Sequence, residues 1–496
     1  MEERNFQLAT REGQAGRREM AERLVVARKP GNAGGATEPQ FKDSARRSDN
    51  RRLTMSLQPP EGVGKLQAAL HGKAKENPSY RFYLLYDKVY RPDVLEYAYR
   101  CCLSNGGAPG VDGQTFDDIE AYGRNRWLGE LAEELRKKTY QPQAVRRVWI
   151  PKPDGKQRPL GIPTIRDRVV QMAAVVVLEP IFEADLQPEQ YAYRKQHSAL
   201  DAVNAVNDLL NRGYTEVVDA DLSGYFDSIP HAELMKSVAR RVSDRHLLHL
   251  VKMWLEAPVE ETDEHGRTQR TTRNKDEGRG TPQGGVASPL LANLYMRRFV
   301  LGWKTLGHAQ RLDAHIVNYA DDFVILTRQG RADEAMAAMR AIMGKLRLTV
   351  HETKTRVCRL PEETFDFLGY TFGRQYCRRT GRAYLGPKPS KKKINRCCEA
   401  ISEATDRCRT LKEARFVVSE LNTKLRGWSN YFRAGTVVHA YGTVMKHTRR
   451  RLRRWLCVKH KVRRGGYARF NNTYLHDELG LLLLPGCTYG PPCASL

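Results

Sequence analysis

Residues 316–326 read Ile-Val-Asn-Tyr-Ala-Asp-Asp-Phe-Val-Ile-Leu, and this stretch says more about the fold than any other. Two apolar arms rich in strand-forming residues flank Ala-Asp-Asp, which predicts a β-hairpin with adjacent carboxylates, Asp321 and Asp322, at a tight turn. Neighbouring aspartates repel each other unless a cation lies beside them. A solvated acidic turn has the same local pattern, so the hairpin alone does not define a site.

A second stretch, residues 217–227, adds a carboxylate at the end of another predicted strand. It reads Val-Val-Asp-Ala-Asp-Leu-Ser-Gly-Tyr-Phe-Asp, so Asp221 follows an apolar strand and precedes a glycine turn. Asp221, Asp321 and Asp322 could converge at the edges of neighbouring strands. Such an oxygen-rich set can hold two Mg²⁺ ions, which would activate a 3′-hydroxyl and stabilise a leaving pyrophosphate.

Strands and helices alternate along the centre of the chain, which predicts an α+β body. Helical periodicity begins near residue 65, and residues 146–164 predict two short strands joined by a Pro-Asp-Gly-Lys turn. Further helices are expected at 167–183, 199–212, 231–255 and 332–346, with a polar loop at 260–279 and a last strand pair near 357 and 365–372. No glycine-rich phosphate loop precedes a helix, and an all-helical basic region is expected to follow the body.

The net charge of +26 over 496 residues indicates an acidic partner, and its distribution is uneven. Residues 371–496 hold 27 Lys and Arg against 7 Asp and Glu, a net +20. Aromatic residues are interleaved with this charge, which favours nucleic-acid binding over a basic tail or a membrane-surface patch. No apolar run is long enough to span a bilayer, and the ten cysteines lack the spacing of a zinc site or a disulfide framework. We therefore expect a cytoplasmic protein.

The ordered set of motifs resembles the group II intron-encoded reverse transcriptase and maturase family. Residues 319–322 match its polymerase signature, and residues 221–226 match the preceding catalytic block. Residues 158–163 and 281–289 match two nucleotide-site blocks, and residues 367–370 resemble the end of the palm. The Asp-Asp pair is a weak signal alone, whereas the ordered set, which extends from about residue 78 to residue 484, is specific.

The resemblance implies a right-hand polymerase with a reverse-transcriptase fold in its fingers and palm, followed by a helical thumb and maturase domain. The division it implies is a flexible extension at 1–60, a helical extension of the fingers at 61–132, fingers and palm at 133–372, thumb and maturase domain at 373–484, and a short tail at 485–496.

The resemblance also implies a role for individual residues. Asp221, Asp321 and Asp322 would be catalytic and bind two Mg²⁺ ions. The residues implied to contact the incoming deoxynucleoside triphosphate are Lys152, Arg158, Phe226, Gln283 and Lys354, with Phe226 excluding a 2′-hydroxyl. Four of them also have a plain structural explanation: the two fingers cations as a solvated basic hairpin, Phe226 as a core aromatic and Lys354 as an exposed turn lysine.

The basic C-terminal region resembles the maturase, or X, domain. Residues 421–433 predict an amphipathic helix around Trp428, with Phe416, Leu421, Leu425 and Phe432 mostly on its apolar face. Residues 446–464 predict a helix that is almost entirely cationic on one side, which suits structured RNA. The residues expected to bind intron RNA are Lys424, Arg426, Arg433, Arg449, Arg450, Arg451, Arg453 and Arg454.

The resemblance thus implies an RNA-directed DNA polymerase that copies its intron RNA during retrohoming and assists splicing, with the intron RNA, a DNA-primed template, deoxynucleotides and target DNA as partners. Only PGCTYGPPCASL follows Leu484, so we expect no His-Asn-His endonuclease and a primer made elsewhere. Two alternatives stay open: a non-enzymatic splicing factor with a relic polymerase, and a reverse transcriptase domesticated for defence or a CRISPR array. The intron, the target site, the oligomeric state and a start at Met1 or Met55 stay open as well.

Overall fold

The computed structural model describes residues 57–151, 157–262, 267–377 and 380–488. The extension predicted at 1–60 lies outside these ranges except for residues 57–60, and so does most of the predicted tail. Lys152, a predicted nucleotide-binding residue, also lies outside the described residues. Within the described ranges, every helix is too short or too polar to cross a bilayer.

The described part of the chain begins with a region of five helices. Its third helix starts with Pro92, whose fixed φ suits a first helical position, and stops before Gly106, which adopts a φ of 64°. The first three of these helices pack against α8 (Ile165–Glu183), and the last packs against the third and the fourth. The helices are α3 (Glu61–Glu76), α4 (Tyr86–Val89), α5 (Pro92–Asn105), α6 (Phe116–Tyr122) and α7 (Arg124–Lys137).

A four-stranded sheet with the order β2-β1-β4-β5 follows this region. The predicted strand pair is confirmed, because β1 (Val145–Pro151) pairs antiparallel with β2 (Gln157–Ile162). The prediction of a polar loop at 260–279 was wrong: β4 (Val259–Thr262) and β5 (Thr268–Thr271) form a hairpin there, followed by α13 (Arg273–Asp276). All four residues of β5 are exposed, so the strand carries no apolar alternation that a sequence could reveal.

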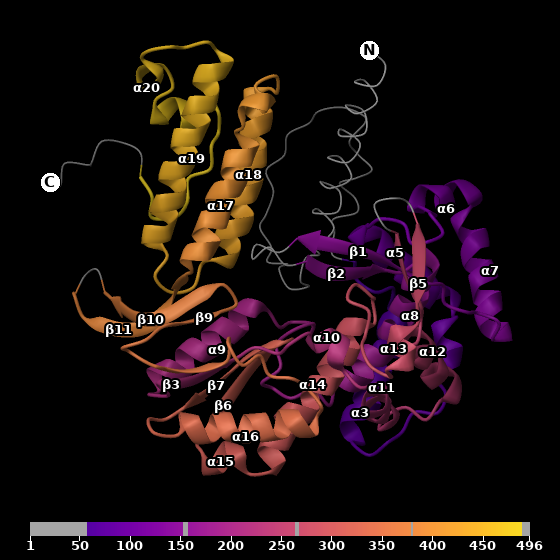
Figure 1. Cartoon of the computed structure of the whole chain (residues 1–496). Coiled ribbons are helices and arrows are strands. Elements are labelled where there is room, and N and C mark those ends of the chain that lie inside the picture. The colour runs from indigo at the N-terminus through magenta and orange to yellow at the C-terminus, as the bar shows by residue number, and fades with distance from the viewer. Residues whose placement is uncertain (1–56, 152–156, 263–266, 378–379, 489–496) are drawn as a thin grey trace.

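The central sheet has the order β6-β7-β3-β8, and neighbouring strands run antiparallel. Its inner strands are apolar on both faces because helices cover both: α9 lies on one side and α16 on the other (Figure 1). Adjacent Val217 and Val218, for example, point into different cores. The elements are α9 (Ala199–Asn211), β3 (Glu216–Ala220), β6 (His315–Tyr319), β7 (Asp322–Thr327), α16 (Ala332–Lys345) and β8 (Arg356–Arg359).

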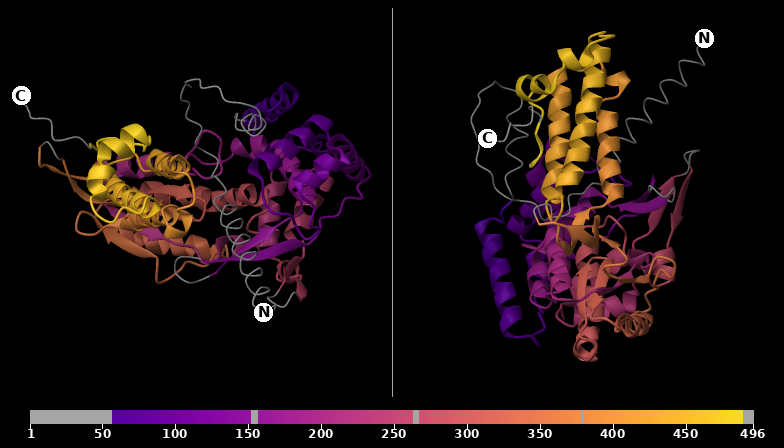
Figure 2. Two further views of the ribbon diagram at one scale, coloured as in Figure 1. Left: turned by 90° about the horizontal axis from the view of Figure 1, so that it is seen from above. Right: turned by 90° about the vertical axis from the view of Figure 1, so that its left-hand side faces the viewer.

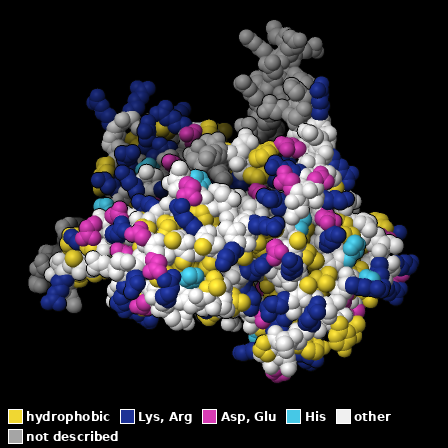
Figure 3. Space-filling model, turned by 60° about the horizontal axis from the view of Figure 1, so that its bottom comes forward, with side chains coloured by type: hydrophobic (Ala, Val, Ile, Leu, Met, Phe, Trp, Pro, Cys, Tyr) yellow, Lys and Arg dark blue, Asp and Glu magenta, His cyan; other side chains and the backbone are white. Residues whose placement is uncertain are grey.

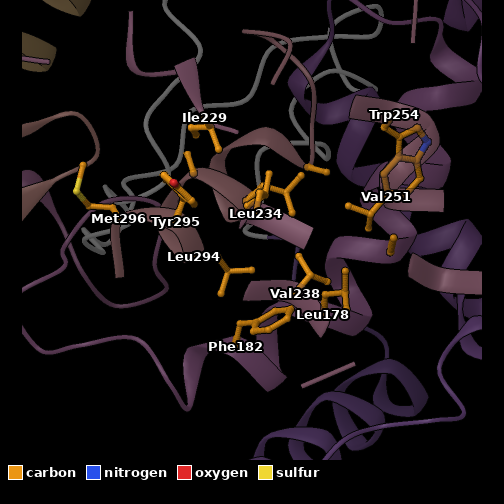
Figure 4. Packing of buried hydrophobic residues seen from close by; sticks show 14 of the residues in the cluster. Leu178, Phe182, Ile229, Leu234, Val238, Val251, Trp254, Leu294, Tyr295 and Met296 are labelled. Atoms are coloured by element: carbon orange, nitrogen blue, oxygen red, sulfur yellow. The ribbon is translucent and has the colours of Figure 1, made fainter. Parts of the chain in front are cut away.

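The largest core joins the N-terminal helices to one face of this sheet. Figure 4 shows Leu178 and Phe182 of α8 lying near Leu234 and Val238. The single helix predicted at 231–255 is in fact two helices, because the Asp244 carboxylate caps a new one by accepting from the backbone N–H groups of His246 and Leu247 in its first turn. The remaining helices of this core are α10 (Tyr225–Ser228), α11 (His231–Ala239), α12 (Arg245–Leu255), α14 (Ser288–Thr305) and α15 (His308–Arg311).

A small sheet of β9 (Phe365–Phe367), β10 (Tyr370–Tyr376) and β11 (Ala383–Pro389) follows, and β11 packs on α9. The region from 373 onward is therefore not helical at its start. β11 contains two prolines, which are uncommon within strands, so its sequence does not predict a strand. An edge strand tolerates them because their missing N–H groups are not all required for pairing.

Helices α17 (Lys391–Ala404), α18 (Ala414–Tyr431) and α19 (Val438–Lys459) then stand side by side on this sheet as a bundle, which we call the helical module (Figures 1 and 2). Short elements complete it: η2 (Arg407–Arg409), α20 (Gly466–Arg469) and η3 (Tyr474–Glu478). Leu421 and Leu425 are buried between its helices as predicted, but Phe416 is 53% exposed, contrary to the predicted apolar face.

Candidate active site and nucleic-acid interface

The three predicted catalytic aspartates lie at one end of the central sheet. Asp321 is in the turn between β6 and β7, Asp322 begins β7, and Asp221 directly follows β3. Strands β3 and β7 pair antiparallel with Ala220 opposite Phe323, so the next pair along this register is Asp221 with Asp322. Opposed residues of an antiparallel pair are only about 5 Å apart between Cα atoms, which brings carboxylates 101 positions apart in the sequence together.

Lys354, which the resemblance implies to contact the incoming nucleotide, contacts one of these aspartates. Its Nζ lies 2.7 Å from Asp221 Oδ2. The segment that carries it is tied to the same place, because His351 N donates to the Asp221 carbonyl and Asp221 N donates to Thr355 Oγ1. The ammonium therefore offsets part of the negative charge that the aspartates concentrate.

The carboxylates fit a divalent cation by donor chemistry, because they are hard oxygen ligands from adjacent strand ends. Asp221 keeps 30% of its side-chain surface exposed while paired with Lys354, so an ion could reach it. Across the described ranges, however, no group of three or more His, Cys, Asp or Glu side chains is already arranged closely enough to hold a metal. Binding an ion there would require the aspartate side chains to turn toward it.

The predicted nucleotide-site residues Arg158 and Gln283 meet, although 125 residues separate them. Arg158 Nε donates to Gln283 Oε1 at 2.9 Å, and Gln283 Nε2 is 3.4 Å from Asp227 Oδ2. Burial raises the pKa of Asp227, while Arg147 and Arg158 lower it. Asp227 was not among the predicted site residues; its place directly after the Tyr-Phe pair of the second motif was the signal available.

Phe226, the predicted gate against a 2′-hydroxyl, is 7% exposed and packs in the large core. Its carbonyl accepts from Thr281 N at 2.7 Å, which connects it to the Pro-Gln-Gly loop. Phe226 is thus a core aromatic, as its structural explanation requires. It also lies next to the loop that carries Gln283, where the predicted gate against a 2′-hydroxyl would have to be.

Tyr193 is a neighbour of the aspartates that sequence reasoning missed. It adopts a φ of 56°, which is unusual for a tyrosine. Burial, Asp321 and Asp322 raise its pKa to about 12, while Arg158 lowers it. The loop that carries it is bonded to β6, since Tyr191 N donates to the Asn318 carbonyl. Its side chain thus lies within electrostatic reach of both Asp321 and the nucleotide-site arginine.

The Pro-Gln-Gly loop lies directly against strand β2. Gly161 N donates to the Gln283 carbonyl at 2.5 Å, and Gly284 has a φ of 111°. A Cβ on Gly284 would overlap the carbonyl oxygen of Gly161. Only glycine permits this approach, which holds Gln283 beside Arg158.

Gly284→Ala should therefore displace the loop and separate Gln283 from Arg158. We expect KM for the incoming nucleotide to rise by about tenfold or more, since an aligned contact is lost. Steady-state kinetics on a primed template would measure it. The control is Gly278→Ala, which shares a positive φ of 60° but has no atom within 4 Å of an added Cβ. Equal effects of the two substitutions would show that backbone strain, and not the close approach, explains the loss.

The predicted RNA-binding residues of the helical module fall into two groups. Three arginines are half-buried and bond within the module: Arg449 to His476, Arg451 to the Ser402 carbonyl, and Arg453 to the Phe470 carbonyl. Their half-buried positions leave less of these three side chains available to RNA, and the RNA-binding role of the whole set stays a prediction. Lys424 lies 3.8 Å from Glu420 and is half-buried. The exposed members of the set are Arg426, Arg433, Arg450 and Arg454.

These two groups predict different outcomes on α19. Arg450→Gln with Arg454→Gln should reduce the slope of log affinity for RNA against log salt by about 2, because two phosphate contacts are lost, and should leave thermal stability unchanged. Arg451→Gln should instead lower thermal stability, because the carbonyls of Ser402 and Thr405 lose their donor. Fluorescence anisotropy at several salt concentrations and thermal unfolding would separate the effects. A reversed pattern would contradict this division.

Two family models match the chain in the order that this architecture requires. Residues 150–372 match "Reverse transcriptase (RNA-dependent DNA polymerase)", and residues 394–474 match "Group II intron, maturase-specific domain". The first covers the central sheet with its aspartates, and the second covers most of the helical module. They confirm the predicted class, a reverse-transcriptase fold followed by a helical maturase region.

Several known proteins are similar to this chain in sequence. Protein YkfC of Escherichia coli K12 is 33% identical over 369 residues, covering 67% of this chain and 94% of that protein. The group II intron-encoded protein LtrA of Lactococcus lactis is 33% identical over 235 residues, covering 47% of this chain and 37% of that protein. A putative COX1/OXI3 intron 1 protein of Saccharomyces cerevisiae is 31% identical over 206 residues, covering 41% of this chain and 23% of that protein. The chain belongs to the family of group II intron-encoded reverse transcriptases and maturases.

Proposed function

We propose that this protein copies intron RNA into DNA from a DNA primer with two Mg²⁺ ions, and that its helical module binds the same intron RNA to assist splicing. The observation that carries the polymerase role is the pairing of β3 with β7, because its register, continued one residue beyond Ala220 and Phe323, sets Asp221 opposite Asp322, with Asp321 in the adjoining turn. Arg158 and Gln283, joined at 2.9 Å, support a nucleotide site next to Phe226 and Asp227.

In this proposal each residue has a defined task. The three aspartates hold the metal ions, which supply a Lewis acid for the attacking and leaving oxygens. Arg158 binds the triphosphate, because a guanidinium pairs with phosphate oxygens through two donors. Phe226 closes the sugar pocket, and Lys354 holds Asp221 in place until an ion replaces it. Lys152, outside the described residues, is proposed as a second triphosphate contact.

We propose fingers and palm at 133–372 and the thumb and maturase domain at 373–484. The segment 150–372, which matches the reverse transcriptase family, lies within the first range, and the segment 394–474, which matches the maturase-specific domain, lies within the second. The exposed arginines of α18 and α19 support the RNA contact. A cytosolic location is proposed too, in keeping with the free thiols of all nine cysteines in the described part of the chain.

A primer-extension assay tests this function. The purified protein, an RNA template, a DNA primer and deoxynucleotides should yield cDNA only when Mg²⁺ is present, and ribonucleotides should be used poorly. Binding of RNA without any synthesis in Mg²⁺ or Mn²⁺ would contradict the polymerase role and favour a non-enzymatic splicing factor.

A further inference from the structure

The far end of the helical module combines exposed cations with an exposed aromatic ring. Residues 421–476 contain fourteen Lys and Arg and no Asp or Glu. Within this stretch, the segment after α19 exposes Lys461, Arg463, Arg464 and Arg469, and between them Tyr467 is 63% exposed. By contrast, both signs of charge are interspersed over the face of the molecule drawn in Figure 3.

The Tyr467 ring is held in place from one side. The Arg453 guanidinium lies 4.4 Å from its centroid, and that guanidinium is fixed by bonds to the Phe470 carbonyl and to Asn472 Oδ1 at 2.8 and 2.9 Å. Phe470, three residues after Tyr467, is 2% exposed and anchors the segment in the core of the module. With one side of the ring covered and most of the residue exposed, the opposite side faces solvent and is available for stacking.

This ring lies far from the catalytic aspartates. Helix α19 has 22 residues, so its two ends are about 33 Å apart. Figures 1 and 2 show α20, which carries Tyr467, at the end of the bundle opposite to the β9–β11 sheet. A base bound here therefore occupies a place separate from the primer end and the incoming nucleotide at the proposed active site.

We propose that Tyr467 is a stacking platform for an unpaired RNA base, with Arg453 holding the ring and the exposed cations of residues 461–469 binding the flanking phosphates. Aromatic side chains bind unpaired bases by stacking, and a cationic rim supplies attraction to the backbone. RNA is chosen over DNA because Tyr467 lies inside the segment that matches the group II intron maturase-specific domain. The inference rests on the proposed RNA binding of the helical module and names one contact within it.

The test compares two RNA probes of equal length: a hairpin with 2-aminopurine in its single-stranded loop, and a blunt duplex. Tyr467→Ala should weaken binding of the hairpin by about 5- to 150-fold, the range found when a stacked aromatic is removed. The salt dependence should not change, because tyrosine carries no charge. Binding of the duplex should also stay the same. Tyr467→Trp should preserve affinity, and its fluorescence should be quenched by the hairpin.

Tyr122 provides a matched control, because Arg126 covers its ring at 4.7 Å in the same way, but its hydroxyl donates to Glu130, a carboxylate that the surroundings of Tyr467 lack in residues 421–476. Tyr122→Ala should leave hairpin affinity unchanged. Equal hairpin affinity of the wild type and Tyr467→Ala would overturn the stacking proposal, as would equal losses on hairpin and duplex. An equal loss on a DNA hairpin of the same sequence would overturn the assignment to RNA. Failure of the wild type to bind any RNA would instead refute the proposed function itself.

Discussion

Replacing Asp321 and Asp322 together by asparagine is expected to abolish cDNA synthesis on a primed RNA template and to leave RNA binding intact. The substitution keeps the shape of the side chains but removes two of three negative charges at the end of the central sheet. A site that stabilises developing charge through metal ions then loses several kcal/mol of that stabilisation, so the rate should fall by about 1000-fold or more. Single-nucleotide extension measures the loss, and anisotropy with labelled RNA measures binding.

The matched control is Asp313→Asn, at the opposite end of strand β6 from the catalytic turn. Asp313 bonds to Tyr214 and Arg328, and half of its side chain is exposed. Its loss should cost at most about 1 kcal/mol of stability and leave synthesis unchanged. Synthesis at normal rates by the double variant would refute the assignment of the active site, whereas loss of RNA binding would show that the substitution has disturbed the fold.

The largest effect on stability is expected at Arg241, which joins the N-terminal helices to the body. Its guanidinium is 1% exposed, pairs with Asp185 at 2.9 Å and donates to the backbone carbonyls of Ala74, Asn77 and Tyr80. Arg241→Met would leave three carbonyls and a carboxylate buried without these donors. The free energy of unfolding should fall by about 3–5 kcal/mol, as measured by urea unfolding followed by tryptophan fluorescence.

Arg240 is the natural comparison, because it bonds to the same Asp185 carboxylate but is 39% exposed. Arg240→Met should cost about 1 kcal/mol or less, since water can replace what an exposed ion pair supplies. If the two substitutions destabilise the protein equally, burial and the carbonyl contacts of Arg241 do not explain its role.

The amino-acid sequence alone determined the class of protein and the positions of the carboxylates that we propose as catalytic. Asp321 and Asp322 are adjacent along the chain and lie between two apolar arms, so the local pattern suffices to predict a hairpin with an acidic turn. The concentration of positive charge also follows from the sequence alone, because the net +20 of residues 371–496 requires no knowledge of the fold. The strands β5 and β11 could not be predicted from the sequence, because β5 is exposed along its whole length and β11 contains prolines.

Only the tertiary structure decided which side chains meet. Lys354 reaches Asp221 across 133 residues, and Arg158 reaches Gln283 across 125, because strand register and loop packing bring them together. The arginines of α19 show the same dependence on packing. Arg451 and Arg453 bond inside the helical module, whereas Arg450 and Arg454 are exposed, and their common residue type does not reveal this difference. A sequence pattern indicates properties that are local to the chain, such as a hairpin or a charged stretch. Contacts between distant side chains depend on how the helices and strands pack, and only the tertiary structure shows them.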